Sequence, residues 1–402
     1  MGEEAALLRE GSARPTRVGS IDAIKAFAIV LVVATHSGRP AMLLPSEPSG
    51  PERVLSALSS AATPLFLFAS GFLSARRPAN AFSVGRTLMR LLVPYVLASC
   101  VAFTIKPEPL QALSPSHSLP LFTRSWWLAL MRLLLSFSVR GVYYYVAIAI
   151  GCALLTPALI KACEKRSGAA CALLLSGALR LAAHARSGAL LPKWIHALSE
   201  PQVYMRLPSF GLWAFTFGLS TSLHLDAPLR RLLLLWPRGG GLLLWCGVFC
   251  WLSEPHRTIS EEQQAARSLA SDLMLMGGSS CLMLLLSSAT PRGLATHPIV
   301  LFLSSCTYTI YLYHILFIDK HHNEVTVPLG VHLLAPEQNQ WIPQRTALGL
   351  GGGVAVAMVG TGILGTWAPL LLGCRLPFSA CGVSTASEDE EELQGCMDAR
   401  HV

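Results

Sequence analysis

The residues best suited to chemistry lie in an apolar stretch near the start of the chain, residues 21–38. Lys25 and His36 stand eleven residues apart in it, which is three turns of an α-helix, so they share one face about 16 Å apart along the axis. Asp22 precedes Lys25 by one turn and can pair with it. The spacing predicts a cation at one mouth of the helix and, deeper in, an imidazole, the side chain that titrates closest to neutral pH.

Each of these groups also has a purely structural interpretation. Asp22 and Lys25 could form an ion pair at a membrane surface, with the lysine reaching the lipid headgroups. His36 could be a core histidine that is hydrogen-bonded to a neighbouring helix. Ionisable groups are expensive at membrane depth, however, and usually mark functional positions. The shared face of Lys25 and His36 therefore favours a functional role.

Further ionisable residues lie in or beside later apolar stretches. Arg86 and Arg90 are four residues apart and stack on one helix face, where they could clamp a phosphate or merely anchor the helix at the cytoplasmic surface. Asp272 is an acid inside an apolar stretch, either neutral or paired, and is a candidate for the same site.

A polar wall is predicted in the stretch 298–318. Thr307 and His314 share a helix face there, and Tyr311 lies beside it, with Tyr308 one turn earlier. The tyrosines and the histidine could line a site, or they could form an aromatic belt at the outer membrane interface.

Composition decides which elements must position these residues. Of 402 residues, 52% are hydrophobic and only 13% are charged, whereas soluble domains carry about 25% charged residues. Apolar stretches near 20 residues exclude a transmembrane barrel, whose strands run to about 10. The net charge of +8 is explained by basic cytoplasmic loops and not by a nucleic-acid partner. The cysteines form no CxxC pair, so neither a metal site nor a disulfide framework is expected.

The fold class that remains is all-α, a polytopic integral membrane bundle of about ten transmembrane helices. The predicted spans are residues 21–38, 54–74, 87–105, 142–161, 168–185, 205–223, 232–252, 268–289, 298–318 and 346–373. Arg180 weakens the fifth span, and Pro237 with Arg238 weakens the seventh. A shorter run, 126–137, opens with Trp126 and Trp127 and suits a helix lying in the interface.

The distribution of basic residues predicts the orientation. The short segments rich in lysine and arginine are the amino-terminal flank and the loops after the second and fourth spans, which places them in the cytoplasm. We therefore expect a multi-pass protein of the plasma (inner) membrane with a cytoplasmic amino terminus. Residues 1–16 would be a cytoplasmic segment, residues 17–373 the membrane domain, and residues 374–402 an acidic, disordered cytoplasmic tail.

Several motifs, in order, resemble the membrane acyltransferase-3 family, whose members O-acylate cell-envelope carbohydrates. Residues 21–26 (Ile-Asp-Ala-Ile-Lys-Ala) are similar to its Leu-Asp-Gly-Leu-Arg-Gly opening, and Lys25 to His36 fits its signature of Arg or Lys, ten residues, then His. Residues 66–73, 90–95 (Arg-Leu-Leu-Val-Pro-Tyr) and 305–314 resemble further family segments, and the likeness spans about residues 17–373. The chain departs from the family where Thr87 replaces the first arginine of Arg-x-x-Arg, and where Lys25 cannot make the bidentate phosphate contact of an arginine.

The resemblance implies transfer of an acyl group, expected to be acetyl, from cytoplasmic acyl-CoA to a hydroxyl of a carbohydrate or lipid-linked envelope acceptor. Acyl-CoA would be a co-substrate, and no tightly bound cofactor is expected. Lys25, Arg86 and Arg90 would bind the donor, and His36 would act as general base or become acylated itself. Asp22, Asp272, Thr307, Tyr308, Tyr311 and His314 would support them. A secondary transporter of a small polar solute and a non-catalytic envelope-assembly scaffold are the alternatives.

Overall fold

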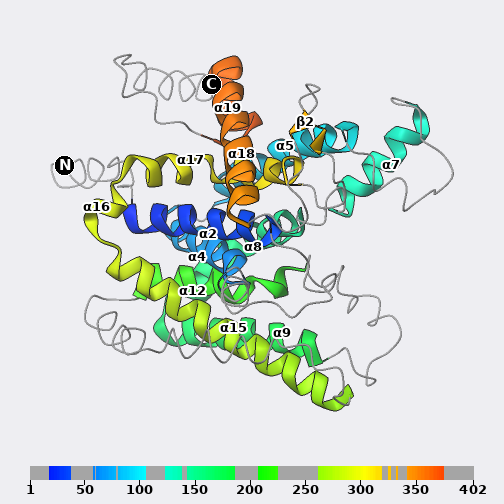
Figure 1. The fold of residues 1–402 in the computed structure, drawn as a ribbon. Coiled ribbons are helices and arrows are strands. Elements are labelled where there is room, and N and C mark those ends of the chain that lie inside the picture. Colours follow the sequence, from blue (N-terminus) through cyan, green and yellow to red (C-terminus); the bar gives the residue numbers. More distant parts are fainter. Residues whose placement is uncertain are drawn as a thin grey trace, which may run out of the picture.

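The computed structural model describes residues 18–37, 58, 60–77, 80–105, 123–137, 143–185, 207–224, 261–318, 325–326, 332–333 and 342–374. Their regular elements, coloured along the chain in Figure 1, are α2 (Gly19–Ser37), α4 (Ala62–Ser74), α5 (Ala81–Ile105), α7 (Arg124–Leu135), α8 (Tyr144–Ala162), α9 (Arg166–Ala185), η3 (Pro208–Phe210), α12 (Leu212–His224), α15 (Glu261–Ala289), α16 (Arg292–Ala295), α17 (Pro298–Tyr313), η5 (His314–Leu316), β1 (Val325–Thr326), β2 (His332–Leu333), α18 (Ile342–Leu364), η6 (Gly365–Trp367) and α19 (Ala368–Leu371). The only sheet in these described parts is the two-residue antiparallel pair β1–β2.

The helices confirm the all-α membrane class. Six described helical segments are long and apolar enough to cross a membrane: Gly19–Ser37, Ala81–Ile105, Tyr144–Ala162, Ala270–Ser287, Pro298–Leu316 and Thr346–Leu371. The helices α4 and α12 have only 13 residues each, and α9 lies outside the six. The predicted span 232–252 lies outside the described residues. A total of about ten crossings therefore stays a prediction. The short run with Trp126 and Trp127 is indeed a separate helix, α7.

The core of the bundle is built around α2. This helix packs against α4, α15, α17 and α18, because apolar residues surround most of its circumference and few of them are exposed. It runs beside α17 in the same direction: Asp22 contacts Ser304 near their starts, and His36 contacts His314 at their ends. Both helices run from left to right in Figure 1.

Neighbouring helices give the bundle two chemically different ends. Thr63, in the first turn of α4, bonds to Tyr144 at the start of α8 over 2.9 Å, and the ring of the adjacent Tyr145 lies 5.3 Å from that of Tyr311. The helix α4 therefore starts near the histidines and runs away from them. We call this the histidine end. The opposite, basic end carries the cations of α2, the α4–α5 connection and α5: Lys25, Arg76, Arg77, Arg86 and Arg90.

Two glycines allow α4 and α12 to cross in backbone contact. A Cβ atom on Gly71 would overlap the carbonyl oxygen of Phe215, and one on Gly218 would overlap that of Phe68. The contact is reciprocal, so neither helix can move away from a new side chain without losing the packing of the other. Small residues at such crossings are how membrane helices gain close contact.

Replacing either glycine by alanine should destabilise the bundle. We expect Gly71→Ala and Gly218→Ala each to cost about 1–3 kcal/mol, because the helix axes must separate, and to lower the Tm of the purified protein in detergent. Gly277→Ala in α15 is the matched control, since a Cβ there meets nothing within 4 Å. An equal loss of Tm in all three variants would contradict the close crossing.

A buried ion pair explains how α9 tolerates an arginine. The guanidinium of Arg180 lies 2.9 Å from a carboxylate oxygen of Asp272 in α15, and the side chains are 2% and 9% exposed. Arg180 also donates to the carbonyl oxygen of Phe210 and lies 4.3 Å above the centre of its ring. The partners offset the cost of burying the cation. Arg180, which weakened the prediction of the fifth span, thus joins α9 to α15 and η3.

The stability of this pair should be non-additive. Arg180→Met and Asp272→Leu should each lower the free energy of unfolding by about 3–5 kcal/mol, because each leaves one buried charge without its partner. The double variant should be more stable than either single variant, since it buries no unpaired charge. Denaturation of all four proteins in the same detergent measures the coupling, and strictly additive losses would show that the pair contributes none.

Candidate functional site

Two histidines from different helices face each other at the histidine end. His36 occupies the last turn of α2 and is half-buried, whereas His314 follows the last turn of α17 and is fully buried. Their ring centroids are 5.1 Å apart and the rings meet edge to face, at 62°. The parallel packing of α2 and α17 is what brings them together.

Backbone contacts determine which ring nitrogen of each neutral histidine carries the proton. The Nδ1 atom of His36 lies 2.7 Å from the carbonyl oxygen of Val32, and that of His314 lies 2.8 Å from the oxygen of Tyr311. A carbonyl oxygen only accepts hydrogen bonds, so Nδ1 must be the donor and Nε2 must hold the lone pair. The Nε2 atom of His314 is buried and has no hydrogen-bond partner in the described part of the chain. Both neutral imidazoles thus keep a lone pair on Nε2.

Tyrosines surround the buried histidine. The ring of Tyr311 lies 6.2 Å from that of His314 and stacks on Tyr308 at 6.3 Å. The Tyr308 hydroxyl donates to the carbonyl oxygen of Leu91 over 2.7 Å, which fixes α17 against α5. Tyr145 meets the other face of the cluster at Tyr311. These polar residues thus lie together, with Tyr145 and Tyr311 buried between helices and Tyr308 half-buried against α5.

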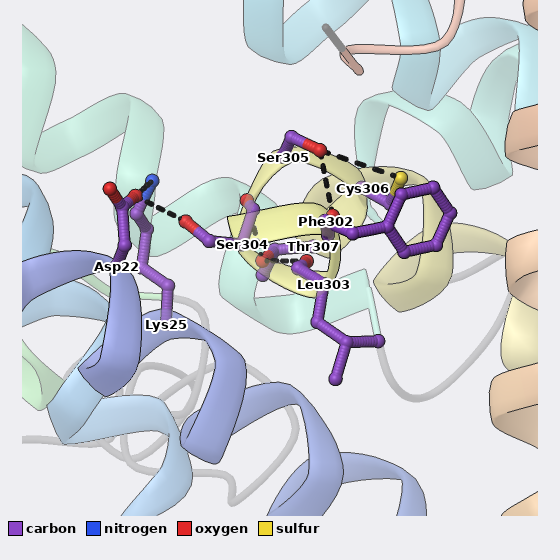
Figure 2. Close-up of polar contacts among 8 residues, drawn as sticks. All are labelled: Asp22, Lys25, Phe302, Leu303, Ser304, Ser305, Cys306 and Thr307. Carbon is purple, nitrogen blue, oxygen red and sulfur yellow. Dashed lines mark hydrogen bonds and ion pairs between the residues drawn. The ribbon is translucent and has the colours of Figure 1, made fainter. Parts of the chain in front are cut away.

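The basic end holds a second polar cluster between the same two helices. Lys25 Nζ lies 3.4 Å from Asp22 Oδ1, as the spacing predicted. The Ser304 hydroxyl of α17 donates to the same carboxylate oxygen over 2.5 Å. Figure 2 shows Asp22 and Lys25 on α2 with Ser304 reaching toward them across the helix interface. Asp22 is buried, whereas the Lys25 side chain is 27% exposed, so the carboxylate lies inside the bundle and the lysine at its edge.

The remaining predicted residues take different places. Arg86 is exposed, with its guanidinium 4.9 Å above the Phe82 ring, and Arg90 is half-buried one turn later. Thr307 bonds back to carbonyl oxygens of its own helix, at Leu303 and Ser304. Asp272 lies apart from the other predicted site residues, because its ion pair with Arg180 joins α9 and α15.

Two participants carried no clear signal in the sequence. Ser304 is a serine in an apolar helix, where such residues commonly bond to their own backbone. Tyr145 belongs to a run of three tyrosines whose orientation depends on how α8 packs. In the described residues, no group of three or more His, Cys, Asp or Glu side chains could hold a metal ion.

The arrangement gives α2 and α17 two separated functions. The histidine end offers a base beside a buried hydrogen-bond acceptor, which suits removal of a proton from a hydroxyl. The basic end offers cations suited to an anionic group such as a phosphate. The distance from Lys25 to His36 along the helix is about 16 Å, so a ligand that uses both ends must be long.

Comparison with known proteins identifies the family of the chain. A family model described as an acyltransferase domain matches residues 18–372, which includes every element from α2 to α19. No curated protein and no solved structure matches the chain. The match contains both clusters between α2 and α17, and the six long apolar helices agree with a multi-pass membrane protein. The chain belongs to the acyltransferase-3 family of membrane acyltransferases.

Proposed function

We propose that the protein transfers an acyl group, acetyl being the simplest, from acyl-CoA to a hydroxyl of an envelope carbohydrate or lipid-linked acceptor. The observation that carries this proposal is the pair of facing imidazoles, His36 and His314, each of which, when neutral, has a lone pair on Nε2. Family membership supports acyl transfer, and the basic end supports an anionic donor.

The donor would enter at the basic end. Its phosphates would lie near Lys25, Arg86 and Arg90, whose cations suit phosphate oxygens. Asp22 accepts a hydrogen bond from Ser304 and pairs with Lys25, so it would hold the lysine in place beside the interface of α2 and α17. The flexible arm of the donor would then run along α2 toward His36. The basic end would face the cytoplasm, with the amino terminus on the same side of the plasma membrane, because short arginine-rich loops stay there.

The reaction would take place at the histidine end. His36 Nε2 removes the proton of the acceptor hydroxyl while the oxygen attacks the thioester carbonyl. The carbon–sulfur bond then breaks, and the thiolate of CoA leaves and takes up the proton from the imidazolium. His314 lies beside this ring, and its Nε2, which has no hydrogen-bond partner in the described residues, would accept a hydrogen bond from the charged imidazole. The competing route, in which the acyl group first bonds to His36, uses the same side chains.

Removal of the imidazole should abolish transfer. We expect His36→Asn to lower kcat by about 10²–10⁴-fold, the range typical of a lost general base. Release of free CoA thiol from acetyl-CoA by the protein in nanodiscs, with extracted envelope glycans as acceptor, measures the loss. Thr35→Ala, a change in the neighbouring residue, is the control.

Three results separate the possibilities. Full activity of His36→Asn would refute the proposed mechanism. Mass spectrometry of a reaction quenched without acceptor would find an acylated His36 only on the covalent route. Uptake of a solute without any release of CoA would indicate a transporter.

Substitutions at the basic end should weaken binding of the acyl donor more than they slow the chemical step. We expect Lys25→Met to raise the KM for acetyl-CoA about 10- to 100-fold, as for a lost hydrogen bond to a charged group, and to leave kcat nearly unchanged. Lys25→Arg should retain most binding because it keeps the charge. Thermal stabilisation by CoA alone should fall in parallel, and a collapse of kcat at constant KM would contradict a donor site here.

A further inference from the structure

A buried tyrosine reaches the turn that carries His314 from another helix. Tyr143, the residue before α8, is fully buried, and its hydroxyl donates to the carbonyl oxygen of Leu312 over 2.9 Å. Leu312 lies two residues before His314, in the last turn of α17. The last four carbonyl groups of a helix have no partner within it, and burial makes an external donor valuable there.

The hydrogen bonds at this helix end can be accounted for individually. The backbone N–H of His314 donates to Ile310, and its Nδ1–H donates to Tyr311. Tyr143 supplies the donor for Leu312. Beyond this point the chain tightens into the turn η5, where the N–H of Phe317 donates to the carbonyl of His314. The bonds to Ile310 and Tyr311 thus come from His314, whose Nδ1 also lies 3.2 Å from the Ile310 carbonyl oxygen, and the bond to Leu312 comes from the start of a different helix.

We propose that Tyr143 is a positioning residue for His314, whose hydroxyl holds the end of α17 so that the imidazole stays beside His36. Without that hydroxyl the buried carbonyl of Leu312 loses the donor that joins α17 to the start of α8, which is unfavourable. The same turn holds the ring of His314 through the bonds from Nδ1 to the carbonyl oxygens of Tyr311 and Ile310. Loss of its anchor to the start of α8 would let this turn shift and carry the imidazole of His314 away from His36. This role rests on the proposed function, in which His314 assists His36.

A neighbouring tyrosine, Tyr95, provides a matched control. Tyr95 is equally buried, and its ring meets that of Tyr143 edge to face at 5.6 Å. The Tyr95 hydroxyl donates to the carbonyl oxygen of Leu134 in α7, over 3.0 Å. Tyr95→Phe and Tyr143→Phe therefore remove the same atom from the same aromatic cluster, but only Tyr143→Phe removes the bond to α17.

The test compares these two variants in nanodiscs with acetyl-CoA and extracted envelope glycans. Tyr143→Phe should lower kcat about tenfold, the effect of one misplaced hydrogen bond, with an unchanged KM for acetyl-CoA. Tyr95→Phe should keep both constants. Hydrogen exchange, which does not depend on activity, should show faster exchange of the amides of residues 310–318 in Tyr143→Phe alone.

Each outcome bears on the proposal. Wild-type kcat in Tyr143→Phe, or equal losses in the two variants, would overturn it, since the second result indicates a general packing effect. If the wild-type protein transfers no acyl group while it binds CoA, the proposed function fails by itself. The exchange experiment then decides alone, and unchanged protection of residues 310–318 in Tyr143→Phe would overturn the positioning role.

Discussion

The parallel packing of α2 against α17 is the constraint on which the rest of the structure depends. It places Asp22 against Ser304 near the starts of the two helices and His36 against His314 at their ends. A change in the register between these helices would separate both pairs at once. The surrounding helices serve this pairing: α4 and α18 pack on α2, and Tyr308 and Tyr143 hold α17 against α5 and α8.

The few polar groups inside this bundle help to determine which helices pack against each other. The chain has 13% charged residues, and at membrane depth an unpaired charge or an orphaned carbonyl has no water to satisfy it. Arg180 pairs with Asp272, and the carbonyl of Leu312 accepts a hydrogen bond from Tyr143. Each such contact joins one helix to a particular partner helix, whereas apolar packing alone would allow several different pairings. Glycines then determine how closely the helices approach, as at the crossing of α4 and α12.

Features that depend on local periodicity could be predicted from the sequence. The Asp22–Lys25 pair, the common face of Lys25 and His36, and the separate helix at Trp126 all follow from spacing within one segment. Contacts between distant segments could not. Arg180 and Asp272 were each conspicuous, yet nothing in a single sequence showed that they meet. His314 was grouped with tyrosines of its own helix, and its partner, His36, depends on the register of α17 against α2. Ser304 had no signal, because its role exists only across the interface.

The pair of Arg180 and Asp272 also has a consequence for the order in which the bundle assembles. Asp272 is synthesised 92 residues after Arg180, so α9 leaves the ribosome long before its counter-charge exists. Until α15 is made, the guanidinium of Arg180 has no Asp272 to pair with, and burying a charge without its partner is costly. The face of α9 that carries Arg180 is therefore buried only after α15 has been synthesised, which makes this contact a late step in the assembly of the bundle.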